Sequence, residues 1–155
     1  MMKLHYCHQL VVDEGSYMIE LTRDQINPTV LVAKSFHPDC GAIVLFLGTV
    51  REFTLTKKTK SLMYEAYEPL ALKLLKSISD QAKEKWKLVN LMVVHRLGCC
   101  KPMEIAVAVI ATAPHRAEAF AACTWAIDEI KKTVPIWKEE TDSTGNSNWI
   151  HPEHS

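Results

Sequence analysis

GAIVLFLGTV, residues 41–50, is an almost continuous apolar run that is rich in β-branched side chains. A run of this length that stops at a charged residue, here Arg51, predicts a strand. Because apolar and polar residues do not alternate along it, we expect both faces of this strand to be buried. The run therefore predicts a sheet that is covered on both sides.

Three helices are predicted around this strand. Asn27-Pro28 starts the first, because asparagine caps a helix and proline fits its first position, and the helix ends before His37-Pro38. Pro69 opens a second helix, and a third begins at Pro114 and ends before Pro135. Apolar residues recur at three- and four-residue spacing in the last two helices, which predicts one buried face on each. These faces are Leu72, Leu75, Ile78, Ala82 and Trp86 in the second helix, and Phe120, Cys123, Ile127 and Ile130 in the third.

Further strands are predicted between and after the helices. They cover residues 17–21, 62–67, 88–95 and 104–111, and a last strand follows Pro135. Leu62, Tyr64 and Ala66 alternate along their strand and should share one face. The order of strands and helices predicts an α+β domain with a mixed, largely antiparallel sheet.

The domain is expected to occupy residues 17–150. Residues 1–16 are predicted to be a loosely specified N-terminal arm, and residues 151–155 a tail. The lysine-rich segment 53–60 is predicted to be a mobile loop. The chain is polar from Thr141 onward, with only Trp149 and Ile150 as apolar anchors.

Composition excludes several classes of protein. Eighteen basic residues balance eighteen acidic ones, which argues against a general nucleic-acid binder. The uncharged runs are too short to span a bilayer and the first residues do not resemble a signal peptide, so no membrane association is expected. The five cysteines are odd in number and show no CxxC spacing. We therefore expect a reduced, cytoplasmic setting, with no metal site and no resident cofactor.

Positive charge lies beside two predicted structural breaks, where an anion could bind. Gly48-Thr49-Val50-Arg51 ends the apolar strand, and the arginine fork there suits an oxyanion. Pro114-His115-Arg116 stands at a helix start, where free N–H groups and the helix dipole favour an anion over basic side chains. Either group could also be an ordinary surface cluster, so both interpretations stay open.

Lysines flank the predicted end of the third helix. Lys131 and Lys132 complement the helix dipole there, which is reason enough for their presence. Lys138 follows Pro135-Ile136-Trp137, in which the two apolar residues are expected to lie in the core. If the chain turns at the proline, Lys131 and Lys138 can reach one pocket, because three extended residues cover only about 10 Å. Crowded cations lower a lysine pKa, and such a lysine can act as a nucleophile or an acid/base.

Other catalytic patterns are missing from the sequence or weak. It contains no GxGxxG, no GxxxxGK[ST] and no GxSxG motif. His95 is predicted to be a hydrogen-bonded core or edge residue. Cys99-Cys100 invites a thiol hypothesis, but nothing near it in the sequence marks either thiol as activated.

Five short stretches carry a family resemblance when they are taken together. They are residues 41–51, Tyr64-Glu65-Ala66-Tyr67, His95-Arg96-Leu97-Gly98, residues 114–120 and residues 131–138. In order and spacing they resemble GA…FxGxVR, YEAY, HRxG, HR..AF and K…PxWK of the molybdopterin synthase large-subunit family. Each motif is modest alone, but their joint occurrence over about residues 17–150 is specific.

The resemblance implies a fold, a reaction and partners. The family fold is an α/β hammerhead with additional β-structure, in agreement with the α+β prediction. The family converts cyclic pyranopterin monophosphate to molybdopterin by adding two sulfurs as a dithiolene. The sulfur arrives as a thiocarboxylate on the C-terminal glycine of a small ubiquitin-like partner subunit. Two large subunits form a homodimer, with one small subunit at each end of a heterotetramer.

Site residues follow from the resemblance by position. The implied substrate-binding set is Thr49, Val50, Arg51, His115, Arg116, Lys131, Lys138, Glu139 and Glu140. Lys131 and Lys138 match the two important pocket lysines of the family, and the arginines and His115 match its anion-binding residues. Our hypothesis is that Lys131 acts at the partner's acyl carbon or on protons, and that Lys138 holds the substrate and stabilises developing charge.

Two alternatives to an enzyme remain open from the sequence. A pterin- or anion-binding module could keep the fold without the chemistry, but it would not need both Lys131 and Lys138. An adaptor that only binds a ubiquitin-like partner would not need Arg51, His115 and Arg116.

Overall fold

The computed structural model describes residues 10–13, 17–54 and 56–150, and the elements lie in these ranges. The helices are α1 (Pro28–Ser35), α2 (Glu68–Trp86) and α3 (Arg116–Thr133). The strands are β1 (Leu10–Asp13), β2 (Tyr17–Thr22), β3 (Ala42–Thr49), β4 (Phe53–Thr54), β5 (Lys57–Ala66), β6 (Asn90–Arg96), β7 (Gly98–Cys100), β8 (Ile105–Ala113), β9 (Ile136–Asp142) and β10 (Ser147–Ile150). Strand β1 comes from the predicted N-terminal arm; the rest of that arm and the predicted tail 151–155 lie outside the described residues.

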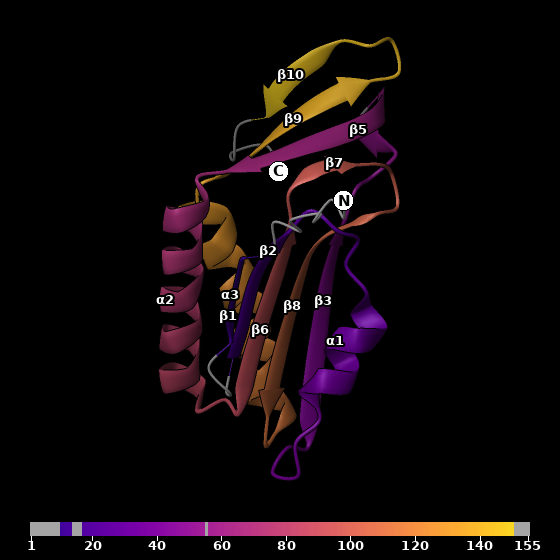
Figure 1. Ribbon diagram of the computed structural model, residues 1–155. Coiled ribbons are helices and arrows are strands. Elements are labelled where there is room, and N and C mark those ends of the chain that lie inside the picture. The colour runs from indigo at the N-terminus through magenta and orange to yellow at the C-terminus, as the bar shows by residue number, and fades with distance from the viewer. Residues whose placement is uncertain (1–9, 14–16, 55, 151–155) are drawn as a thin grey trace, which may run out of the picture.

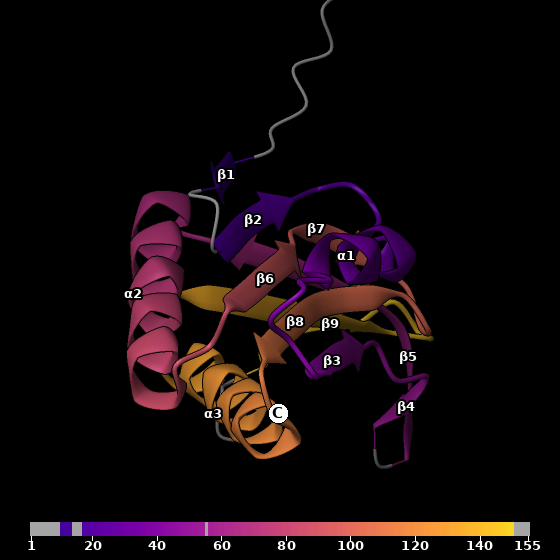
Figure 2. The ribbon, with the colours of Figure 1, turned by 90° about the horizontal axis from the view of Figure 1, so that it is seen from below.

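The main sheet has the strand order β1-β2-β6-β8-β3. Strands β2 and β6 are parallel, and the other described pairs in this sheet are antiparallel. Helices α2 and α3 cover one face of the sheet, and α1 lies on the other (Figures 1 and 2). The predicted α+β fold with mixed, largely antiparallel β-structure is therefore confirmed.

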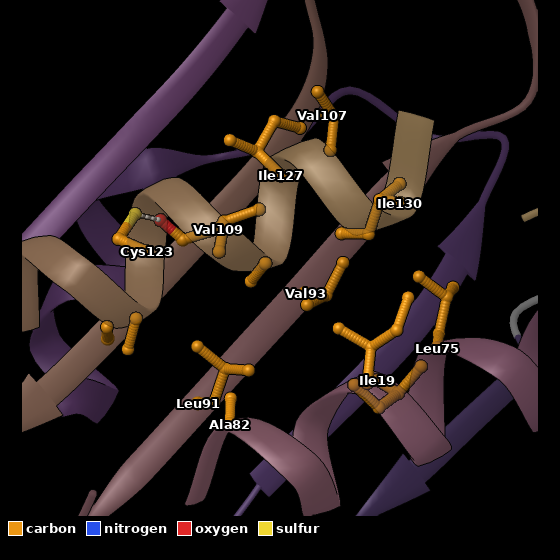
Figure 3. Close-up of a cluster of buried hydrophobic side chains, with 14 of the residues drawn as sticks. Ile19, Leu75, Ala82, Leu91, Val93, Val107, Val109, Cys123, Ile127 and Ile130 are labelled. Carbon is orange, nitrogen blue, oxygen red and sulfur yellow. Dashed lines mark hydrogen bonds between the residues drawn. The ribbon is translucent and has the colours of Figure 1, made fainter. Parts of the chain in front are cut away.

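Each face of the main sheet has its own apolar cluster, because neighbouring residues of a strand point to opposite faces. Ile19 and Val93 pack against α2 and α3 on one face, in the cluster that includes Leu75 and Ile127 (Figure 3). On the other face, residues of the same strands meet α1 through Leu31. The burial of both faces explains why the middle of β6, residues 91–94, is continuously apolar.

Strand β3 packs on both faces as predicted, yet its side chains are only partly buried. Val44 and Phe46 contact the cluster under α2 and α3, whereas Ile43 and Leu45 contact the cluster under α1. The strand lies at the edge of the sheet, so the side facing away from β8 has no neighbouring strand in the described chain. This edge position leaves the side chains of β3 half-exposed.

A second sheet lies across the upper ends of the main strands (Figure 1). Its strand order is β10-β9-β5-β4, with β7 also paired to β5, and all these pairs are antiparallel. Segment 53–60 was predicted to be a loop, and that prediction is wrong, because β4 and β5 form a hairpin there. The polar chain after Thr141 likewise forms a hairpin with β9, closed by Asp142, whose Oδ1 accepts from the N–H groups of Thr144 and Asn146.

The helix starts agree closely with the sequence, and one buried face does not. The side chain of Asn27 accepts hydrogen bonds from Thr29 N and Val30 N, and Pro28 occupies the first turn. In α3, however, Phe120 is 61% exposed, which contradicts its predicted burial. The buried face steps back four residues from Cys123 and so uses a small alanine instead of Phe120. No helix among the described residues has the length and apolar character needed to cross a membrane.

Candidate active site between the two sheets

A cavity of about 800 Å³ lies between the two sheets and the C-terminal end of α3. Its wall combines apolar side chains with a few charged and polar ones. The lining residues are Phe46, Gly48, Thr49, Arg51, Thr54, Thr59, Leu62, Tyr64, His95, Ala106, Val107, Ile127, Ile130, Lys131, Val134, Ile136, Trp137, Lys138, Glu140 and Ile150. A mostly apolar cleft of this size with a few polar groups is typical of a small-molecule site.

Three cationic side chains reach this wall from three different elements. Arg51 follows the end of β3, Lys131 lies in the last turn of α3, and Lys138 is in β9. The connection between the two lysines is short, because α3 ends at Thr133 and β9 begins at Ile136. The turn at Pro135 thus places both lysines on one cavity, which is the geometry that the short connection predicts.

The two residues between this proline and Lys138 do not share one environment. Ile136 packs against the large apolar cluster, so its predicted place in the core is confirmed. Trp137 lines the cavity but is 48% exposed, so the prediction that it is a core residue is wrong.

Lys138 has the perturbed chemistry that a crowded cationic pocket predicts. Burial lowers the pKa of the Lys138 amine, and the charges of Lys131 and Arg51 lower that pKa further. Glu140 opposes these effects and raises the pKa of Lys138. The net direction is downward, so the amine loses its proton more readily than an ordinary lysine does.

The two carboxylates after Lys138 point to opposite sides of β9. Glu140 lines the cavity, and its Oε1 accepts a hydrogen bond from the hydroxyl of the buried Thr59. Glu139 pairs with Met63 and is not part of the cavity wall. Strand alternation therefore keeps one of the two predicted glutamates at the site and turns the other away.

The predicted residues at the end of β3 also separate. Thr49 lines the cavity. Val50 is only 3% exposed and packs with Leu62, Cys100 and Ala106 in a small apolar cluster. Its backbone N–H donates to the carbonyl of Glu104 at 3.0 Å, so Val50 supports the wall rather than forming it.

His115 and Arg116 do not join the cavity of their own chain. They stand at the start of α3 and are exposed, whereas Lys131 stands near its end. A straight helix rises 1.5 Å per residue, so Arg116 and Lys131 are separated by about 22 Å along its axis. The single anion pocket that the sequence predicts is therefore not formed within one chain.

His95 and Tyr64 are among the cavity residues that the sequence did not assign to the site. The prediction that His95 is a hydrogen-bonded core residue is confirmed, since it is 7% exposed and its Nδ1 lies 2.9 Å from the carbonyl oxygen of Arg96. Burial lowers the pKa of His95 to about 4 and raises the pKa of Tyr64 to about 12, so both side chains are neutral at ordinary pH. The signal in the sequence was the alternation that puts Tyr64 on the same face as Leu62.

Neither a metal centre nor an activated thiol emerges from the described part of the chain. It holds no group of three or more histidine, cysteine, aspartate or glutamate residues arranged to bind a metal ion. Cys100 is buried, and burial raises the pKa of its thiol, while Cys99 is exposed on β7. A thiol kept protonated is a poor nucleophile, so the thiol hypothesis gains no support.

Comparison with known proteins identifies the family. A family model described as "MoaE protein" matches residues 21–133. The chain belongs to the MoaE family. Relatives of this MoaE chain include the molybdopterin synthase catalytic subunits of Bacillus subtilis, 41% identical over 84% of this chain and 83% of the relative, and of Culex quinquefasciatus, 39% identical over 87% of this chain and 88% of the relative.

Solved structures extend the comparison to the fold. The crystal structure of molybdopterin synthase from Staphylococcus aureus matches this MoaE chain with a TM-score of 0.80 and 38% identity, over 84% of this chain and 95% of that one. A complex of subunits 1 and 2 of molybdopterin-converting factor from Helicobacter pylori matches with a TM-score of 0.69 at 19% identity, which supports the fold alone.

Proposed function

We propose that this chain is the catalytic subunit of a molybdopterin synthase. In this proposal it is a cytoplasmic sulfurtransferase that moves sulfur from the thiocarboxylated C-terminus of a small ubiquitin-like subunit to cyclic pyranopterin monophosphate. Relatives that carry this name cover most of the chain. The observation that carries the proposal is the gathering of Arg51, Lys131 and Lys138 on one cavity, with the pKa of Lys138 lowered.

The cavity suits a substrate that joins a ring system to a phosphate. Its cationic residues attract the anionic part, and lysine and arginine side chains bind phosphate oxygens through charge-assisted hydrogen bonds. Its apolar residues, such as Leu62 and Ile136, can contact a flat ring. In a partly dry pocket these interactions are stronger than in water.

The sulfur transfer places defined demands on the two lysines. The thiocarboxylate sulfur forms a bond to a substrate carbon, the bond from that carbon to its oxygen substituent breaks, and the oxygen leaves with a proton supplied by the site. The bond between the transferred sulfur and the partner's acyl carbon then breaks. The acyl group is released as a carboxylate when water attacks; when a lysine amine attacks, the acyl group is held on that lysine as an amide, and water must hydrolyse this amide to free the partner's carboxylate and the amine. We assign this attack, or the accompanying proton transfer, to Lys131, and we assign substrate holding and charge stabilisation to Lys138.

His115 and Arg116 need a second copy of the chain to take part in this site. They lie at the far end of α3 from Lys131, so their own cavity is out of reach. The proposed assembly is a homodimer of this chain within a heterotetramer, and a neighbouring copy can bring its exposed helix start to the cavity. In this arrangement the pair binds the phosphate at the helix N-terminus.

Reconstitution with the small subunit tests the proposed function. The chain is mixed with cyclic pyranopterin monophosphate and either the thiocarboxylated partner or the same partner with an ordinary C-terminal carboxylate. We expect dithiolene product only with the thiocarboxylate, measured by trapping and mass spectrometry. Tight substrate binding without product would instead favour a pterin-binding module, and partner binding without substrate binding would favour an adaptor.

A further inference from the structure

His95 is a buried polar side chain on the cavity wall that the sulfur chemistry above does not use. It lies near the end of β6 and is 7% exposed. Its ring meets the ring of Tyr64 edge-on, with the centroids 5.3 Å apart. Both rings line the cavity.

The hydrogen bond of His95 determines which ring nitrogen carries the hydrogen. Nδ1 lies 2.9 Å from the carbonyl oxygen of Arg96. A carbonyl oxygen can only accept, so Nδ1 is the donor and Nε2 of the neutral ring carries a lone pair. No group in the described part of the chain is hydrogen-bonded to this Nε2. The cavity wall therefore presents an acceptor that the protein itself leaves open.

The unprotonated Nε2 of His95 could act as a general base or as a hydrogen-bond acceptor, and the pKa of the ring favours the second role. Burial lowers the pKa of the imidazole to about 4. A general base works best when its pKa lies near the operating pH, so His95 is poorly suited to remove a proton at neutral pH. A neutral imidazole nitrogen remains a good hydrogen-bond acceptor, and in a dry pocket a donor left without a partner is penalised.

We propose that Nε2 of His95 accepts a hydrogen bond from an N–H or O–H donor on the ring system of the ligand. This inference rests on the proposed function, in which the ligand carries both a pterin ring and a phosphate. Lys131, Lys138 and Arg51 attract any anion, so they select poorly among phosphorylated molecules. His95, beside Tyr64, is a substrate-binding residue that distinguishes the correct ring from a bare anion.

Two substitutions separate the acceptor from the packing of the ring. His95→Asn keeps an N–H near the position of Nδ1, so the bond to Arg96 can persist, but it removes the acceptor at the Nε2 position. His95→Gln restores an acceptor near that position. The matched control is His37→Asn, which changes an exposed histidine that follows α1 and does not line the cavity.

The test is calorimetric binding of cyclic pyranopterin monophosphate, and separately of inorganic phosphate, to the full chain assembled with its small subunit. We expect His95→Asn to weaken pterin binding about tenfold, the factor for one hydrogen bond, with phosphate binding unchanged. KM should rise by a similar factor while kcat changes little. His95→Gln should recover most of the affinity, and the control should match the wild type.

Several outcomes would overturn the inference. Unchanged pterin affinity in the His95→Asn variant removes the hydrogen bond from recognition. An equal loss of phosphate affinity shows that the change disturbed the whole cavity. If His95→Asn does not fold, as judged by thermal unfolding, His95→Phe keeps a ring against Tyr64 and carries the same comparison. Failure of the wild type to form product with normal pterin binding would contradict the proposed function alone, because the affinity ratios still report on His95.

Discussion

The substitution Gly48→Ala tests how tightly β3 packs against β8 in the cavity wall. Gly48 pairs with Val107 across strands β3 and β8, and both residues line the cavity. A Cβ at position 48 would lie 2.6 Å from Cγ1 of Val107 and 3.4 Å from Cε1 of Phe46. Carbon atoms pack at about 3.5–4.0 Å, so the contact with Val107 is short by about 1 Å.

The cost follows from the stiffness of the neighbour. Val107 is β-branched and buried, so its Cγ1 cannot turn away without leaving a preferred rotamer. Overpacking of this kind costs about 1–3 kcal/mol. For a chain of this length each kcal/mol lowers Tm by about 2–4 °C, so we expect a decrease of about 2–12 °C. Thermal and urea unfolding of the two proteins measure it.

A double-mutant cycle identifies the contact that causes the loss. Val107→Ala removes Cγ1, and the new methyl group at position 48 can then occupy the vacated space. Gly48→Ala should therefore be nearly neutral in the Val107→Ala background, so the coupling energy should equal the overpacking cost of about 1–3 kcal/mol. An equal cost in both backgrounds, or no cost in the wild-type chain, would refute the reasoning about this wall.

Two pH effects follow from the buried titratable groups. Because the charge of Arg51 lowers the pKa of Lys138, Arg51→Gln should raise that pKa; the midpoint for acetylation of Lys138, followed by mass spectrometry, should move to higher pH, and an unmoved midpoint would contradict the coupling. Burial lowers the pKa of folded His95 from 6.5 to about 4, so between these values the unfolded chain binds the extra proton. The free energy of unfolding should thus fall as pH drops from about 6.5 to about 4, and His95→Asn should flatten that decrease; an unchanged slope would show that other groups cause it.

Local chemistry made much of the fold predictable. The Asn27-Pro28 pair predicts a helix start, because the asparagine cap and the fixed φ angle of proline both stabilise the first turn of a helix. The run 41–50 likewise predicted a strand that packs on both faces. These features depend only on residues that are neighbours in the sequence, so they can be predicted without knowledge of the rest of the structure.

Polar edge structure was not predictable by the same means. The first half of β5 carries exposed lysines and β10 begins with exposed Ser147 and Asn148, so these segments lack the apolar alternation that Leu62, Tyr64 and Ala66 give to the second half of β5. The β9–β10 hairpin is held together by backbone pairing, by the Asp142 turn and by a hydrogen bond of 2.8 Å between the hydroxyls of Thr141 and Ser147. The predicted burial of Phe120 was wrong because a helix face that contains Ala119 fits the spacing as well as one that contains Phe120.

Within the site, too, the features that were predictable are those that depend on residues close together in the sequence. The sequence predicted that Lys131 and Lys138 lie close together, because only a short turn joins α3 to β9. His115 and Arg116 could not be placed, since only the straight course of α3 reveals their distance from that pair. His95 lines the cavity because the second sheet lies over the end of β6, and this arrangement cannot be predicted from the residues near His95 in the sequence.

The central claim is that Lys131 takes part in sulfur transfer, and a single-turnover assay tests it most directly. Lys131→Ala and Lys132→Ala are compared with the wild type, using the thiocarboxylated small subunit and cyclic pyranopterin monophosphate. Lys132 is the matched control, because it is the next residue in the same helical turn, is exposed and pairs with Glu129 at 3.4 Å. We expect Lys131→Ala to slow dithiolene formation by about 100-fold or more, and Lys132→Ala to leave the rate nearly unchanged. A near-normal rate for Lys131→Ala would contradict the mechanism.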